Sequence, residues 1–106
     1  MSSNKQPQYR LSPQALDDLE EVWRYTAEQW SIAQAERYVD ELVQTFSHIA
    51  AMPLLARERK EITPPVRIHI NGNHLIVYRI ESDHIAIIRI LGGRQNWQAI
   101  LTMLDS

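Results

Sequence analysis

The sequence predicts a single α+β domain in which a helical hairpin packs on a small, mainly antiparallel four-stranded sheet. Two stretches with apolar residues at helical spacing follow each other, over about residues 13–29 and from residue 32 to just before Pro53. Three β-rich segments come after residue 65. The chain has 106 residues, of which 44% are hydrophobic, so it can build one core. We expect residues 1–7 to form a flexible N-terminus and residues 8–106 to form the domain.

The N-terminal half carries start signals for two helices. Polar and apolar residues alternate at Tyr9–Leu11, which predicts a short strand. Ser12 then precedes Pro13, and this pair is typical of a helix start because serine caps free amides and proline fits the first turn. Ser31 begins the second helix, with the capping-box spacing to Gln34. Two amphipathic helices in direct succession form a hairpin.

The C-terminal half predicts three strands and a closing helix. Residues 54–65 are charged and contain prolines, so we expect them to be irregular. Asn71-Gly72 is a strong hairpin turn signal, because both residue types tolerate positive φ. The most apolar segment is expected at the centre of the sheet, covered on both faces. The expected strands are Val66–Ile70, Leu75–Ile80 and Ile85–Leu91, followed by a short helix around Ile100–Leu104, which gives the order β-α-α-β-β-β-α.

Composition and spacing argue against several classes of function. The chain has no cysteine, and its four histidines lack metal-ligand spacing, so we expect no metal and no cofactor. A net charge of −2 and a pI of about 6.0 argue against direct sequence-specific binding of nucleic acid. No apolar run is long enough to span a membrane and no export signal is recognisable, so a cytoplasmic location is expected.

Arginine and tryptophan are the residues most suggestive of function. Arg67, Arg79 and Arg89 each interrupt an apolar strand, and Arg94 follows the pair Gly92-Gly93. A buried arginine needs a carboxylate or carbonyl groups around it. These four arginines therefore either line a shared face of the sheet or pair with Glu81, Asp83 or helix carboxylates. Tryptophan and arginine also dominate interface hot spots.

Several segments together resemble one protein family. They are "YRLSPQALDDLEEVWRY", "AERYVDELVQTF", "LIVYRI" and "IIRILGGR", and in this order and spacing the chain resembles the ParE branch of the RelE/ParE toxin superfamily from Tyr9 to about Leu101. The resemblance implies a bacterial toxin that is held inactive by a cognate antitoxin encoded nearby. RelE-like members cut mRNA in the ribosomal A site, whereas ParE-like members bind DNA gyrase and trap it on cleaved DNA.

The residues favour the ParE branch. RelE-like cleavage uses basic side chains on the sheet and a C-terminal tyrosine or histidine. Leu75 stands where RelE carries an arginine at the start of the third strand, and no tyrosine or histidine follows Arg94. We therefore predict a toxin that inhibits DNA gyrase by protein binding, without catalytic residues.

The predicted contact residues follow from this resemblance and from position. Residues around the last strand and helix are expected to bind the target: Arg67, Arg89, Arg94 and Trp97. Residues on the helical hairpin are expected to bind the antitoxin: Trp23, Trp30 and Tyr38. Two alternatives stay open. The first is a RelE-like endonuclease that uses Arg94 with Arg67, Arg79 or His74. The second is an inactive toxin-fold partner of an antitoxin, since Gly92 and Asn96 depart from the usual His and Asp of the family.

Overall fold

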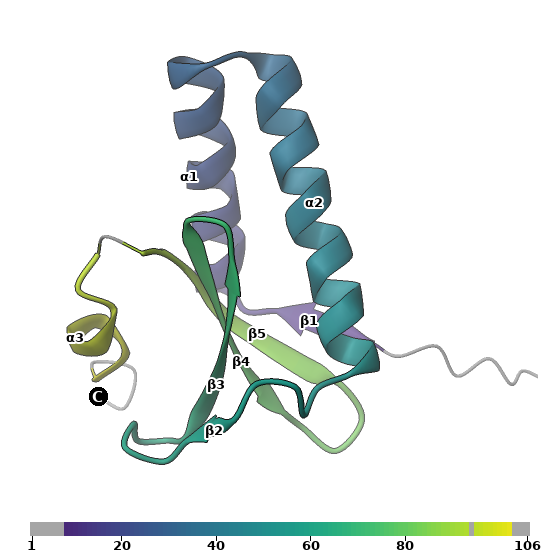
Figure 1. Cartoon of the computed structure of the whole chain (residues 1–106), viewed down its shortest axis with the longest axis vertical. Helices are drawn as coiled ribbons and strands as arrows, with labels where there is room; N and C mark the ends of the chain where they lie inside the picture. Colours follow the sequence, from purple (N-terminus) through teal and green to yellow (C-terminus); the bar gives the residue numbers. More distant parts are fainter. Residues whose placement is uncertain (1–7, 94, 103–106) are drawn as a thin grey trace, which may run out of the picture.

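One five-stranded sheet carries a helical hairpin on one face and a short helix on the other (Figure 1). The computed structural model describes residues 8–93 and 95–102. Across the sheet the order is β1-β5-β4-β3-β2, with β1 parallel to β5 and the other neighbours antiparallel. The α+β class and the hairpin on the sheet are confirmed. The elements are β1 (Tyr9–Leu11), α1 (Pro13–Gln29), α2 (Ile32–Ala51), β2 (Glu58–Arg59), β3 (Val66–Asn71), β4 (His74–Ile80), β5 (Ile85–Gly92) and α3 (Trp97–Thr102).

The sheet has one strand more than the four expected from the sequence. The additional strand, β2, contains only Glu58 and Arg59, which pair with Arg67 and Val66 of β3. It lies within residues 54–65, which were expected to be irregular. Two adjacent charged residues show no alternation of polar and apolar side chains, so the sequence pattern could not mark them as a strand. A short, charged strand at the edge also discourages pairing with other chains.

The central strand is β4, and the expectation that the last strand is central was wrong. β5 lies between β1 and β4, because β1 adds to its outer edge. Apolar content indicates that a strand is interior, but it does not order two interior strands. The expectation that β5 is covered on both faces is confirmed, since Ile87 packs on the side of the hairpin and Leu91 on the side of α3.

Both predicted helix starts are confirmed. The Oγ of Ser12 accepts a hydrogen bond from the amide of Ala15, and the Oγ of Ser31 accepts one from the amide of Gln34, both at 3.0 Å. The Ser12 hydroxyl also donates to the carbonyl of Ile88 at 2.8 Å. Ser12 therefore both begins α1 and attaches it to β5.

The helical hairpin buries fewer apolar side chains than its spacing suggested. Ala15 and Val22 are the buried residues of α1, whereas Trp30, at the junction of the helices, is 76% exposed. Leu16 and Ile32 are also mainly exposed. The hairpin projects well beyond the strands in Figure 1, so the sheet cannot cover its distal end. Apolar surface is consequently left free on the hairpin.

Two hydrophobic clusters pack on opposite faces of the sheet. The cluster under the hairpin includes Phe46 of α2 and Tyr78 of β4. The cluster on the other face includes Val77 of β4 and Leu101 of α3. Each large side chain buried in this way stabilises the fold by about 1.5–3 kcal/mol. Apolar burial on both faces of the sheet therefore stabilises the fold, and the short helix α3 is needed to cover the second face.

A β-bulge in β5 changes which side chains face the hairpin. Val77 pairs with Arg89 and Tyr78 pairs with Ile87, so Ile88 has no partner across the strand pair. Ile87 and Ile90 both belong to the hairpin-side cluster. Without the extra residue, simple alternation would have placed Arg89 on this face instead of Ile90. The bulge thus completes the apolar core.

Asp18 of α1 connects the hairpin to β5 immediately after this bulge. Its carboxylate accepts hydrogen bonds from Nε and Nη2 of Arg89, at 2.8 and 2.9 Å, and from the amide of Ile90, at 2.9 Å. The side chains of Asp18 and Arg89 are only 16% and 19% exposed. This pairing raises the pKa of Arg89 above its ordinary value. Arg89 is therefore part of the framework that holds α1 on the sheet.

The turn between β3 and β4 is held against α2. Asn71 and His74 are the last paired residues, so the two-residue loop is Gly72-Asn73, one position later than expected. Gly72 has a φ of +60°, and Asn71 stays extended as part of β3. The hydroxyl of Tyr38 on α2 lies 2.6 Å from Nδ1 of His74 and 3.4 Å from the carbonyl oxygen of Asn71. Tyr38 thereby fixes the turn to the hairpin.

We predict that replacing Asp18 by Asn lowers the free energy of unfolding by about 2 kcal/mol, because Arg89 loses its charged partner in a poorly solvated position. Urea denaturation measures the change. The matched control is Glu21→Gln, since the ion pair of Glu21 with Arg24 on the same helix is exposed. That control is expected to change stability by less than about 0.5 kcal/mol. Equal losses in the two variants would contradict the role assigned to Asp18.

The stability of the fold is also expected to depend on pH through the protonation of His69 and His74. Burial lowers the pKa of His74, and burial together with the nearby His48 lowers that of His69. Below the ordinary value of about 6.5 the unfolded chain then binds more protons than the folded chain, so stability is full above this pH and falls as the pH decreases. Denaturation between about pH 7.5 and pH 5.5 measures the effect. The double variant His69→Gln/His74→Gln should show a flatter pH dependence, and an unchanged slope would refute the prediction.

Candidate functional site

Arg67 lies on the hairpin side of the sheet and serves as a contact to the loop that follows α2. Its Nη1 donates to the carbonyl of Ala56 at 2.6 Å. Its cross-strand neighbour Tyr78 donates its hydroxyl hydrogen to the carbonyl of Pro53 at 2.7 Å. Burial raises the pKa of Tyr78, so its hydroxyl stays protonated as a donor. The two side chains together bind the loop of residues 52–56 to the sheet.

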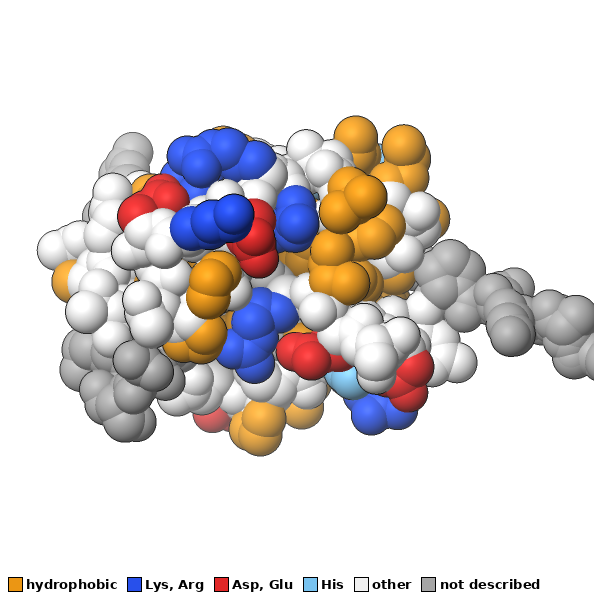
Figure 2. Space-filling view, turned by 90° about the horizontal axis from the view of Figure 1, so that it is seen from below, with side chains coloured by type: hydrophobic (Ala, Val, Ile, Leu, Met, Phe, Trp, Pro, Cys, Tyr) orange, Lys and Arg blue, Asp and Glu red, His pale blue; other side chains and the backbone are white. Residues whose placement is uncertain are grey.

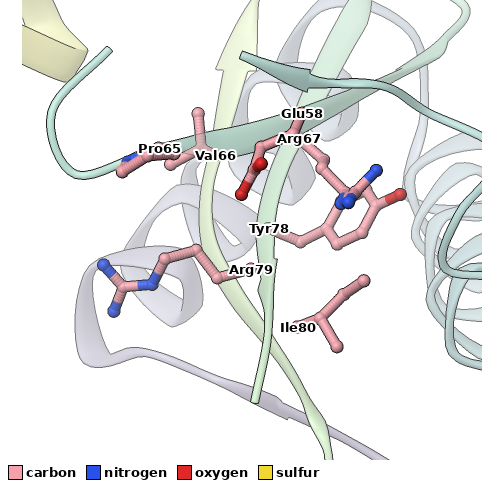
Figure 3. Close-up of a pocket in the computed structure, with 7 residues that line it drawn as sticks. All are labelled: Glu58, Pro65, Val66, Arg67, Tyr78, Arg79 and Ile80. Carbon is pink, nitrogen blue, oxygen red and sulfur yellow. The ribbon is translucent and has the colours of Figure 1, made fainter. Parts of the chain in front are cut away.

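Arg79 lies on the opposite side of β4, as Figure 3 shows. Its Nε is 3.5 Å from Oε2 of Glu81, and both side chains are partly exposed. This pairing with Glu81 is one of the two arrangements considered from the sequence. The end of the β3–β4 pair encloses a hollow of about 110 Å³, lined by Glu58, Pro65, Val66, Arg67, Tyr78, Arg79 and Ile80. The hollow holds no more than a few waters, so we assign it no ligand.

Trp97 is the first residue of α3 and packs against the cluster on the second face of the sheet. The guanidinium carbon of Arg59 lies 5.7 Å from the centroid of its ring. This is a cation–π contact between the edge strand β2 and the last helix. It joins these two short elements at the second face of the sheet.

Among the four residues predicted to bind the target, the three that the structure describes do not form one group. Arg67 and Trp97 both lie near β2 but on opposite faces of the sheet, and Arg89 is paired with Asp18 beside α1. Arg94 lies outside the residues that the structure describes. The register explains why Arg67 and Trp97 are apart, since Arg67 pairs with Tyr78 on the hairpin face, whereas Trp97 packs on the cluster of the other face.

The three residues predicted to bind the antitoxin also lie in different environments. Trp23 lines a shallow groove on the hairpin together with Leu16, Leu19 and Val39. Trp30 is at the free end of the hairpin, and Tyr38 is engaged with the β3–β4 turn. Trp23 is therefore the member of this set that lies in a concave apolar surface.

One exposed feature was missed in the sequence. Residues Met52, Leu54 and Leu55 follow α2 and are 48%, 72% and 60% exposed. Leu54 and Leu55 lie in the stretch expected to be irregular, residues 54–65, and Met52 lies at the expected end of the second helix. The available signal was the segment "MPLLARERK", in which apolar residues meet a charged run without belonging to an amphipathic helix or strand. Because these residues do not belong to the apolar face of a helix or strand, no packed face covers them and they remain exposed.

Neither a metal centre nor a membrane-crossing helix is found in residues 8–93 and 95–102. No group of three or more His, Cys, Asp or Glu side chains in this part could hold a metal ion. No helix in it is both long and apolar enough to cross a bilayer. Of its histidines, His74 contacts Tyr38 and His84 lies 2.7 Å from a carboxylate oxygen of Asp83.

Comparison with known proteins connects this fold to one family. The family model described as the ParE toxin of the type II toxin–antitoxin system parDE matches residues 9–97. Toxin ParE1 of Mycobacterium tuberculosis is 37% identical over 89 residues, which cover 83% of this chain and 91% of that protein. Toxin ParE1 of Caulobacter vibrioides is 33% identical over 93 residues, which cover 88% and 96%.

A solved structure has the same fold. It is described as the chromosomal ParDE toxin–antitoxin system from P. aeruginosa, and it superposes with a TM-score of 0.71 at 16% identity over 84% of this chain and 98% of that one. At this identity the solved structure is evidence for the fold alone. The family model and the two relatives are evidence for the family, because they match in sequence. The chain belongs to the ParE family, the toxin components of type II toxin–antitoxin systems.

Proposed function

We propose that this toxin inhibits DNA gyrase by binding it, and that a cognate antitoxin neutralises the toxin by covering part of its surface. Membership of the ParE family supports this proposal. The structural observation that carries it is the dispersal of the three described arginines Arg67, Arg79 and Arg89. Arg67 contacts a loop carbonyl, Arg89 is bound to Asp18, and Arg79 lies on the other face of the sheet from Arg67.

This dispersal speaks against the alternative of an mRNA endonuclease. In-line attack by a ribose hydroxyl requires several positive groups around one phosphate and an acid–base group within reach. The histidine considered for that role, His74, shares a hydrogen bond with Tyr38. Leu75, in the position where the nuclease branch carries arginine, is buried. A binding function needs no such cluster.

The proposed antitoxin-binding site is the groove on the helical hairpin around Trp23. Its apolar lining of Leu16, Leu19 and Val39 suits the apolar face of a helix. Asp17 and Glu20 also line the groove, so basic residues beside the apolar face of the partner would be favoured. Because both proposed partners are found in the bacterial cytoplasm, we propose that the toxin acts there.

The target is tested with purified DNA gyrase. We expect the toxin at about micromolar concentration to inhibit supercoiling and to accumulate cleaved DNA, because binding that holds the cleaved complex blocks religation. Primer extension on mRNA from induced cells is the parallel measurement. Untouched supercoiling without cleaved DNA would overturn the gyrase assignment. Discrete cuts within codons would establish the endonuclease instead, and the absence of any growth defect would indicate an inactive toxin fold.

The antitoxin-binding site is tested with the antitoxin, which is expected to be the product of the adjacent gene. Leu16→Glu should weaken its binding about tenfold or more, because a charge then enters an apolar groove that already contains Asp17 and Glu20. Calorimetry measures the affinity. Ile70→Glu is the control, since Ile70 is comparably exposed on β3, away from the hairpin groove. An unchanged affinity of the Leu16 variant would exclude this groove as the antitoxin-binding site.

A further inference from the structure

The loop after α2 presents a group of exposed apolar side chains. Met52, Leu54 and Leu55 are each about half exposed or more. Ile80 is also exposed, and it lies on the same face of β4 as Tyr78, whose hydroxyl binds the carbonyl of Pro53. We name Met52, Leu54, Leu55 and Ile80 the apolar knob. Figure 2 shows hydrophobic side chains gathered on this end of the molecule, next to a group of Lys and Arg side chains.

The loop that carries the apolar knob is held in place by the sheet. Tyr78 is 1% exposed and binds the carbonyl of Pro53, while Arg67 binds the carbonyl of Ala56. The loop also closes on itself, since the amide of Leu55 donates to the carbonyl of Met52 at 3.3 Å. The buried Tyr78 and the half-buried Arg67 therefore hold the loop with its exposed leucines on the sheet. A surface ordered before binding loses less conformational entropy when a partner docks.

The charges at the end of the sheet that carries the apolar knob differ in sign from those of the helical hairpin. Arg79 and Arg59 at this end lie on the other face of the sheet from Tyr78, so the basic groups nearest the knob are Arg57, Lys60 and Arg67. Residues 53–81 contain five basic side chains, Arg57, Arg59, Lys60, Arg67 and Arg79, and three acidic ones, Glu58, Glu61 and Glu81. Residues 13–51 contain eight acidic side chains and two basic ones. The protein thus has an acidic hairpin and a basic sheet end, although its net charge is −2. Charge complementarity favours an acidic partner at the sheet end.

We propose that the apolar knob and its basic rim, the exposed side chains of Arg57 and Lys60, are the surface through which this toxin docks on its target protein, at a site with carboxylates around an apolar centre. This proposal rests on the gyrase-binding function proposed above and names the part of the toxin that performs it. A protein is favoured over nucleic acid because leucine side chains have no complement on a phosphate backbone, and because three carboxylates lie among the basic groups.

The surface is separate from the hairpin groove assigned to the antitoxin. The groove is lined by residues of α1 and α2 on the acidic side of the protein, and the apolar knob is carried by the loop after α2 and by β4. The two sites also differ in charge, so they select different partners. A substitution in the knob is therefore expected to separate target binding from antitoxin binding.

The experiment compares Leu54→Glu/Leu55→Glu with the wild-type toxin in a gyrase supercoiling and DNA-cleavage assay. We expect the concentration for half-inhibition to rise about tenfold or more, with unchanged affinity for the antitoxin. Leu54→Met/Leu55→Met should retain activity, because it keeps an apolar surface of similar volume. Ile70→Glu serves as the matched control, as an equally exposed isoleucine outside the knob, and should behave as wild type.

A second variant tests the rim without touching the leucines. Arg57 is on the surface, and only Glu61, at 3.8 Å, pairs with it among the described residues. Arg57→Glu should raise the half-inhibition concentration about threefold to tenfold at low salt, and the difference should shrink as ionic strength increases. This variant retains the buried contacts of Tyr78 and Arg67, so its fold is expected to remain intact.

Four outcomes would overturn the proposal. The first is a Leu54→Glu/Leu55→Glu toxin that inhibits gyrase like the wild type. The second is loss of antitoxin binding in that variant with gyrase inhibition preserved, which would assign the knob to the antitoxin. The third is a wild-type dimer that this variant converts to a monomer, which would assign the knob to a second copy. The fourth is a wild-type toxin without effect on gyrase, and only this outcome also removes the proposed function.

Discussion

The hydrogen bonds that Asp18 accepts from strand β5 hold the helical hairpin in position on the sheet. One carboxylate accepts two of them from Arg89 and one from the amide of Ile90. The bulge at Ile88 makes this arrangement compatible with an apolar core, because it turns Ile90 toward the hairpin and leaves Arg89 beside α1. Ser12 adds a contact to the carbonyl of Ile88 at the start of α1. The charged contact and the core therefore depend on the same irregularity in one strand.

This framework determines which arginines are available for function. Arg89 supports the fold, and Arg67 positions a loop whose own side chains are exposed. The exposed basic groups among the described residues are Arg57 and Lys60 between α2 and β3, together with Arg10 on β1, Arg24 on α1 and Arg37 on α2. An arginine inside a strand is surrounded by neighbours that it must satisfy, whereas a basic residue in a loop stays in water. The loop after α2 and the helical hairpin are therefore the surfaces proposed for binding, while Arg67 and Arg89 of the strands support the fold.

Much of the fold could be predicted from local patterns. The caps at Ser12 and Ser31 and the bounds of α1 agree with the structure, because capping and helical periodicity are interactions within a few residues. The predictions were wrong for features that depend on strands pairing with segments distant in the sequence. The strand β2 exists only because β3 lies beside it, and the order of β4 and β5 depends on where β1 adds. Gly93 illustrates the same limit, since its closest constraint is the carbonyl oxygen of Asn73, to which its amide donates at 2.7 Å.

The sequence by itself determined the class of fold, the boundaries of the two long helices and, through its ordered motifs, the toxin family, whereas α3 begins at Trp97, three residues before the expected start. All of these depend on residues that are near one another in the chain or on the order of segments along it. Only the tertiary structure decided that Arg67 and Arg79 lie on opposite faces, that Arg89 belongs to Asp18, and that the leucines after α2 are held exposed. The physical reason is register: a shift of one residue in a strand reverses every side chain, and neither the bulge at Ile88 nor the pairing of β2 leaves a trace in local sequence.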